Sequence, residues 1–181
     1  MGARRVMRVI TEVAGEAQGL VPVEVLGRIP GALGPVAEEI FRFLCPEWGP
    51  SGDLFLSVNF IDEGQMSELN HRFMGEGHPT DVLSFPIHAS EGKFTCPVPL
   101  PECLLGDIMV CLPRVLENAL EAGHSPVKEL SLVLVHGLLH LLGWNHETEE
   151  GRREMWDIQG HYLERVERCL TPPERRADPG A

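Results

Sequence analysis

The hydrophobic positions along the chain change period several times, and each period predicts one kind of element. Val36, Ile40 and Leu44 recur at helical spacing and predict a helix. Apolar residues then occupy every second position of 54–60, which is the period of a strand. Residues 63–73 return to helical spacing, so the first part of the chain is predicted to run helix, strand, helix.

The middle of the chain predicts two more strands and a loop between them. The stretch TDVLSFPI at 80–87 indicates a strand that Pro86 either ends or places at a sheet edge. Residues 104–110, LLGDIMV, indicate a third strand. Between these strands, 89–102 is rich in proline and glycine and has no periodicity, which predicts a long exposed loop.

Three helices are predicted in the remaining part. Pro113 suits a first helical position and Gly123 a helix end. Ser125 then caps a second helix that Gly143 closes, and this helix is so apolar that it should be the buried centre of the fold. Apolar positions within 155–166 predict a last amphipathic helix with a charged outer face.

Together these elements predict an α+β fold with one domain over 1–170, in which helices pack on a small mixed β-sheet around a central buried apolar helix. A chain of 181 residues with 43% hydrophobic positions is long enough for one such core. The polar tail 171–181 is predicted to be disordered. We find no signal peptide and no apolar run long enough for a bilayer, so we expect a soluble, cytoplasmic protein without membrane association.

Cysteine content and charge limit the possible chemistry. The five cysteines are an odd number and none form a CxxC pair, which argues against a disulfide framework or a cysteine-rich zinc site and predicts ordinary thiols. The net charge of −12 is unusual for a protein that grips nucleic acid by neutralising phosphates. A nucleic-acid role would therefore need a local basic patch or a metal ion.

The stretch VHGLLHLLGWNH contains the strongest chemical signal. His136 and His140 lie four residues apart, so on a helix their Cβ atoms are about 6 Å apart and both imidazoles reach one ion at about 2.0–2.1 Å. Gly143 permits a left-handed turn that returns His146 to the same face as a third ligand. Three histidines plus one water molecule form the ligand set of a catalytic zinc ion.

These histidines also fit two other interpretations. A single histidine on an apolar helix is more often a hydrogen-bonded core residue, but two on one face and a third after a glycine turn favour a metal. The spacing also resembles the zinc motif of metzincin proteases, in which a glutamate after the first histidine is the general base. Gly137 occupies that place here, so a metalloprotease-like hydrolase would lack its base.

Several motifs of the chain resemble those of a known family. HGLLHLLGWNH at 136–146 is followed by Met155, and the chain also contains LN at 69–70, PTDVLSFP at 79–86 and LGDI at 105–108. These motifs, in this order, resemble the YbeY family of bacterial endoribonucleases, also called rRNA maturation factors.

The resemblance implies a small α+β fold with a mixed sheet and one zinc ion bound by His136, His140 and His146. It also implies single-strand-specific cleavage of RNA during rRNA maturation, including processing of the 16S rRNA 3′ end, and a part in ribosome quality control. The expected partners are single-stranded RNA or rRNA and the ribosome or its proteins, and no DNA. The attacking group stays open, because zinc can lower the pKa of a bound water to about 7 or polarise a phosphate oxygen for the RNA 2′-hydroxyl.

One position departs from the family pattern. Family members usually carry an arginine where this chain has Met74, and Arg72 lies two residues earlier. Arg72 either serves the phosphate from a shifted position as a catalytic residue or is a solvated helix residue. Without a guanidinium, phosphate binding should weaken. This departure favours an alternative function, a non-catalytic, zinc-stabilised factor associated with the ribosome.

The remaining polar residues have simpler explanations available. Asp81 either orients the site or caps a turn, and Ser84 either faces the cleft or only lies in its strand. Glu147 is the nearest candidate base in sequence but also fits a solvated surface. Asn145 is predicted to shape its turn. Trp144 and Met155 are predicted to pack beneath the metal turn. Four histidines without ligand spacing are predicted to lie at the surface: His78, His88, His124 and His161.

Overall fold

A four-stranded sheet carries the fold in the computed structural model, which describes residues 8–15, 19–48, 52–98 and 102–173. The strands are ordered β1 (Arg8–Gly15), β2 (Asp53–Phe60), β6 (Glu102–Val110) and β3 (Val82–Pro86). The first three are parallel and β3 pairs antiparallel with β6, so the sheet is mixed, with β3 at one edge. The α+β class and the edge position of the Pro86 strand are confirmed.

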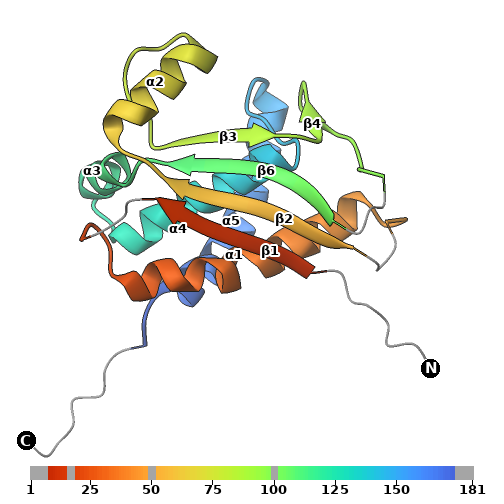
Figure 1. The fold of residues 1–181 in the computed structure, drawn as a ribbon, viewed down its shortest axis with the longest axis horizontal. Helices are drawn as coiled ribbons and strands as arrows, with labels where there is room; N and C mark the ends of the chain where they lie inside the picture. The colour runs from red at the N-terminus through yellow and green to blue at the C-terminus, as the bar shows by residue number, and fades with distance from the viewer. Residues whose placement is uncertain (1–7, 16–18, 49–51, 99–101, 174–181) are drawn as a thin grey trace, which may run out of the picture.

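The helices α1, α4 and α5 cover one face of the sheet (Figure 1). α1 (Val23–Leu44) packs on β1, and α4 (Pro126–Leu141) packs on β3 and β6. α5 (Glu149–Leu170) contacts both α1 and α4, and α3 (Leu112–Ala122) contacts α4. α4 is thus enclosed by the sheet on one side and by other helices around it, which makes it the predicted central helix.

Local sequence sets where α4 begins and ends. The hydroxyl of Ser125 accepts a hydrogen bond from the backbone N–H of Lys128 at 3.1 Å, and Pro126 is the first helical residue. Beyond the last turn Gly143 has a φ of +94°, a conformation that costs glycine little. Most α4 side chains between these ends are buried. Burial of so many leucine and valine side chains supplies the main free energy that holds the helix in place.

α2 (Glu63–Met74) connects β2 to the edge strand and is delimited equally clearly. The Asp62 carboxylate accepts from the Gln65 backbone N–H at 2.8 Å, and the Gln65 side chain accepts from the Asp62 N–H at 3.1 Å. This reciprocal capping box satisfies two donors at the helix start. Gly75, at a φ of +78°, ends the helix in a left-handed cap.

The N-terminal part differs from the prediction. β1 precedes α1, so the order is strand, helix, strand, helix, and the predicted order lacked the first strand. The sequence RVITEVAG groups its apolar residues in pairs, so it lacks the strict alternation by which a strand is recognised. α1 also begins earlier than the apolar pattern around Val36 suggested, and it contains Pro30 and Pro35.

The predicted loop 89–102 contains a small hairpin. β4 (Ala89–Ser90) pairs antiparallel with β5 (Lys93–Phe94), and the two turn residues Glu91 and Gly92 both have positive φ values, 51° and 71°. Two left-handed residues form the turn type that matches the twist of a hairpin. The Phe94 ring lies 6.0 Å from that of Phe41 in edge contact, so part of the segment is packed rather than exposed.

The prediction that all cysteines are free thiols is wrong for two of them. Cys45 and Cys96 form a disulfide, with Cα atoms 5.7 Å apart across a sequence separation of 51 residues. The fold brings the end of α1 beside the segment that follows β5, and no local spacing in the sequence predicts that these two cysteines pair. Cys103, Cys111 and Cys169 are free.

No helix of the described chain is both long and apolar enough to cross a bilayer. Of the tail predicted to be disordered, only 171–173 is described, so that prediction falls mainly outside the described residues.

Candidate metal centre

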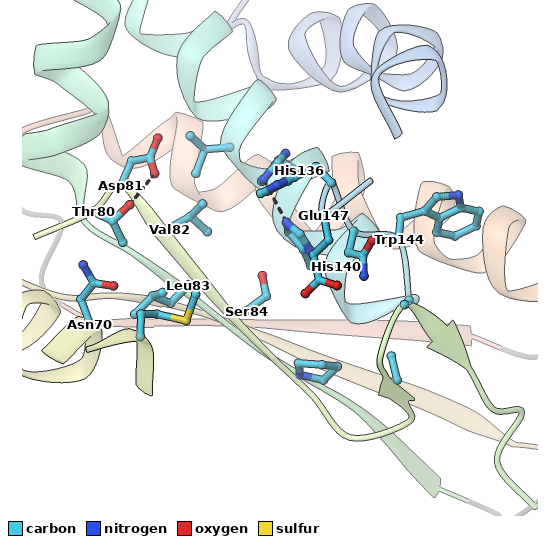
Figure 2. A pocket seen from close by; sticks show the side chains of 18 of the residues that line it. Asn70, Thr80, Asp81, Val82, Leu83, Ser84, His136, His140, Trp144 and Glu147 are labelled. Atoms are coloured by element: carbon cyan, nitrogen blue, oxygen red, sulfur yellow. Dashed lines mark hydrogen bonds between the residues drawn. The ribbon is translucent and has the colours of Figure 1, made fainter. Parts of the chain in front are cut away.

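α4 presents two of the predicted ligands on one face. The ring centroids of His136 and His140 lie 4.6 Å apart, and their Nε2 atoms lie 3.1 Å apart (Figure 2). Both side chains are partly buried. Neighbouring ligand atoms around a tetrahedral zinc ion, at metal to nitrogen distances of about 2.0–2.1 Å, are separated by about 3.3 Å. The two Nε2 atoms therefore have the separation that one shared ion requires.

The turn after α4 brings the third histidine to the same place. A Cβ atom on Gly143 would lie 2.7 Å from the backbone nitrogen of Phe94, so only glycine permits this contact with the hairpin. The His146 ring lies 5.6 Å from that of His136 and 5.2 Å from that of His140, measured between centroids. One ligand atom from each of the three histidines lies within 4.8 Å of the others.

A hydrogen bond fixes which nitrogen of the first histidine is available. His136 Nδ1 lies 3.0 Å from the side-chain oxygen of Gln159. An amide oxygen only accepts hydrogen bonds, so this contact favours the tautomer with the proton on Nδ1 and the lone pair on Nε2. That lone pair faces His140, which is the arrangement a metal ligand needs. Sequence reasoning missed Gln159, since it lies on another helix and no spacing connects it to the ligands.

Burial keeps the helix histidines uncharged. Burial lowers the pKa of His136. Burial, together with electrostatic repulsion by the His136 and His146 rings, lowers the pKa of His140 to about 4. A neutral imidazole is the form that binds a metal ion. The donor set, the separation of its atoms and the neutral state of His136 and His140 fit a divalent ion. Imidazole ligands suit zinc, copper, iron and nickel.

A cavity of about 700 Å³ opens beside the histidines and follows β3 to the end of α2 (Figure 2). His136 and His140 lie at one end of it, and Asn70 and Thr80 lie toward the other. Its charged lining side chains are acidic: Glu76, Asp81, Glu91 and Glu147. None of the described residues that line it is lysine or arginine.

The position at which family members usually carry an arginine borders this cavity. Met74 lines it and is 66% exposed. Arg72, for which the sequence leaves open both a shifted phosphate contact and a solvated helix position, is exposed and does not line the cavity. Its guanidinium carbon lies 5.5 Å from the centroid of the Phe73 ring. This position favours the solvated alternative for Arg72 over a phosphate contact.

The polar residues of the quoted motifs fix backbone segments around the cavity. Asp81 accepts hydrogen bonds from Asn118 of α3 at 3.0 Å and from Thr80 at 3.2 Å. Ser84 donates to the backbone carbonyl of Gly137 at 3.0 Å, joining the edge strand to α4. Asn70, which is buried, donates to the backbone carbonyl of His78 at 2.8 Å. Ser84, Asp81 and Asn70 also line the cavity, so they both shape it and border it.

The prediction of surface positions holds for only two of the remaining histidines. His78 and His161 are exposed, but His88 and His124 are partly buried, because each has a packed partner. His88 Nε2 lies 3.3 Å from Cys103 Sγ, and His124 Nε2 lies 3.2 Å from the Glu129 carboxylate.

The two residues predicted beneath the metal turn differ from each other. Met155 is fully buried in the core, whereas Trp144 lines the cavity and donates to Glu154 at 3.2 Å. The side chain of Asn145 packs against the hairpin, since a Cβ on Gly92 would lie 2.7 Å from its amide nitrogen.

A family model described as endoribonuclease YbeY matches residues 29–167 of the chain. The chain belongs to the YbeY family. Proteins named endoribonuclease YbeY are similar to it: one from Clavibacter michiganensis is 39% identical over 71% of this chain and 84% of its own length. Another from Bacillus licheniformis is 34% identical over 77% of this chain and 89% of its own length.

The fold also has a solved counterpart. The solution structure of TM1509 from Thermotoga maritima covers 95% of this chain and 99% of its own, with a TM-score of 0.53 and 29% sequence identity. The resemblance inferred from the histidine motif is thus confirmed, and the YbeY family is one of enzymes that hydrolyse RNA.

Proposed function

We propose that this YbeY-family protein is a zinc-dependent endoribonuclease that cleaves single-stranded RNA. It acts in the cytoplasm on rRNA, including the 3′ end of 16S rRNA, and takes part in ribosome quality control with the ribosome or its proteins as partners; DNA is not a substrate. One observation carries the proposal: three imidazoles converge at the end of an open cavity, in a chain of an endoribonuclease family.

The proposed ligands are His136, His140 and His146. When bound, a divalent ion supplies a Lewis acid for a phosphoryl oxygen and a means of lowering the pKa of water. The protein holds the ion without competition from protons, because burial keeps the two helix histidines uncharged at neutral pH. It also leaves the ligand face open toward the cavity, where a strand of RNA would lie along β3.

Charge makes the RNA-binding part of this proposal depend on the metal. The chain has a net charge of −12, and the described cavity lining has four carboxylates and no lysine or arginine. A phosphate group entering the cavity therefore meets no lysine or arginine side chain among the described lining residues. We expect RNA binding, as well as cleavage, to be lost when the metal is removed.

The experiment measures zinc content, RNA affinity and cleavage on the same preparations. Purified protein is stripped with a chelator, reloaded with zinc and given an unstructured RNA, beside His140→Ala and the exposed control His161→Ala. We expect one zinc per chain, cleavage by the wild type and by His161→Ala, and a loss of at least about 100-fold in His140→Ala. If His140→Ala and His136→Ala both lose zinc yet cleave normally, the proposal is overturned.

The second candidate is a non-catalytic, zinc-stabilised factor associated with the ribosome. Met74 in the cavity and the acidic lining favour it, because neither neutralises a scissile phosphate. Stoichiometric zinc without cleavage by the wild type would select this function. The metalloprotease alternative gains no support. A Cβ atom at Gly137 would lie 2.9 Å from Ile108 of β6, so this position has no room for a catalytic carboxylate.

A further inference from the structure

We infer that Gln159 is a positioning residue for the metal centre, which sets the tautomer and the ring orientation of His136. The inference rests on the proposed ligand set and assigns a role to a residue outside it. Gln159 lies on α5, 23 residues from His136, and its side-chain oxygen is 3.0 Å from His136 Nδ1.

The chemistry of the amide defines what this contact does. The Gln159 oxygen can accept a hydrogen bond but cannot donate one, so it selects the imidazole form protonated at Nδ1. In that form Nε2 carries the lone pair, and Nε2 is the atom that lies 3.1 Å from His140 Nε2. Without the acceptor, His136 would exchange between two neutral tautomers and two ring orientations, and part of the population could not bind. Partners of this kind around metal-binding histidines also raise the basicity of the ligand.

α5 holds the amide firmly enough for this role. Met155, one turn before Gln159, is completely buried in the core. Tyr162, one turn after it, donates to the Glu39 carboxylate at 3.1 Å, which links α5 to α1. Arg165 forms an ion pair with the same carboxylate at 2.6 Å. Gln159 is thus anchored on both sides, and its own side chain is only partly buried.

The test compares Gln159→Leu, which removes the acceptor, with Gln159→Glu, which keeps one. Asp157→Leu is the control, because Asp157 is exposed on the same helix. Metal-free proteins are titrated with zinc in competition with a chromophoric chelator. We expect zinc affinity to fall by about 10- to 100-fold in Gln159→Leu and to stay within about threefold of wild type in Gln159→Glu and Asp157→Leu.

A second readout separates positioning from general damage to the fold. Nitrogen-15 NMR of the metal-free protein should show His136 protonated at Nδ1 in the wild type and in Gln159→Glu, and a mixture of tautomers in Gln159→Leu. Thermal unfolding of the metal-free variants should match the wild type. If Gln159→Leu folds poorly, Gln159→Ala removes the acceptor without demanding more space.

The failures are distinguishable. Equal zinc affinity in wild type and Gln159→Leu overturns this inference and leaves the histidine site intact. A wild type that binds no zinc overturns the proposed ligand set, and the inference with it.

Discussion

At the scale of single residues, the surroundings that make His140 a good metal ligand also make the stability of the metal-free protein depend on pH. His140 is partly buried beside two other imidazoles, and these surroundings lower its pKa to about 4. In the unfolded chain the same side chain has a pKa of about 6.5. Between these values the unfolded chain binds a proton that the folded chain does not, so protonation favours unfolding.

The metal-free protein should therefore lose stability as the pH falls from about 6.5 to about 4. One proton taken up on unfolding limits the contribution of His140 to about 1.4 kcal/mol per pH unit. Urea unfolding of chelator-treated protein at pH 7 and pH 5 measures the loss, and His140→Gln should show a shallower dependence. Identical dependence in both proteins would show that His140 is not the titrating group.

At the scale of elements, the contact between α4 and the sheet places the ligand pair. A Cβ on Gly137 would lie 2.9 Å from Ile108 Cγ2 and 3.2 Å from the Ser84 hydroxyl, so glycine lets the helix approach β6 and β3 closely. The Ser84 hydroxyl then bonds the Gly137 carbonyl at 3.0 Å. On β6, a Cβ at Gly106 would lie 2.9 Å from Leu141 Cδ2 of α4 and would also collide with the Phe85 carbonyl of β3, so glycine allows both elements to approach there.

Gly137→Ala should destabilise the protein by about 1–3 kcal/mol, because overpacking outweighs the better helix propensity of alanine. Gly160→Ala is the matched control: Gly160 is also helical, and nothing lies within 4 Å of its Cβ position. That substitution should stabilise the protein by about 0.5–1 kcal/mol. Chemical denaturation of both variants measures the change in the free energy of unfolding. A stabilised Gly137→Ala protein would refute the close contact.

At the scale of the whole molecule, one covalent bond joins distant parts of the chain near the metal turn. The Cys45–Cys96 disulfide connects the end of α1 to the segment after the β4–β5 hairpin. That hairpin contacts the turn at Gly143 through Phe94 and packs its other end against Asn145. The hairpin is thus held between the disulfide and the turn that carries the third histidine.

Reduction of this disulfide should lower the free energy of unfolding by about 2–4 kcal/mol, because the bond restricts the unfolded chain across a separation of 51 residues. Cys96 is exposed, so a reductant can reach the bond. Urea unfolding with and without a phosphine reductant measures the effect, with a Cys45→Ala/Cys96→Ala double variant as control. Unfolding midpoints that do not respond to reductant in the wild type would contradict the prediction.

The sequence predicted what depends on local periodicity and short spacings. The apolar run of α4, its Ser125 cap and its Gly143 end could be recognised because each is local, and they place the three histidines together. The Cys45–Cys96 pair, the Gln159 contact and the partners of His88 and His124 could not, since each joins segments that only the folded chain brings together. Residues 8–15 were missed for a different reason: their apolar residues do not alternate.

The tight fit at Gly137 also has a consequence for protein engineering. Converting this metal motif into that of the metzincin proteases requires a glutamate at a position where a Cβ atom would lie 2.9 Å from Ile108 Cγ2 and 3.2 Å from the Ser84 hydroxyl. A single substitution would force a carboxylate against the sheet, and trimming Ile108 first would open a void in the core. A laboratory attempt to install the protease motif should therefore change Ile108 and Ser84 together with Gly137, because these two residues contact the position.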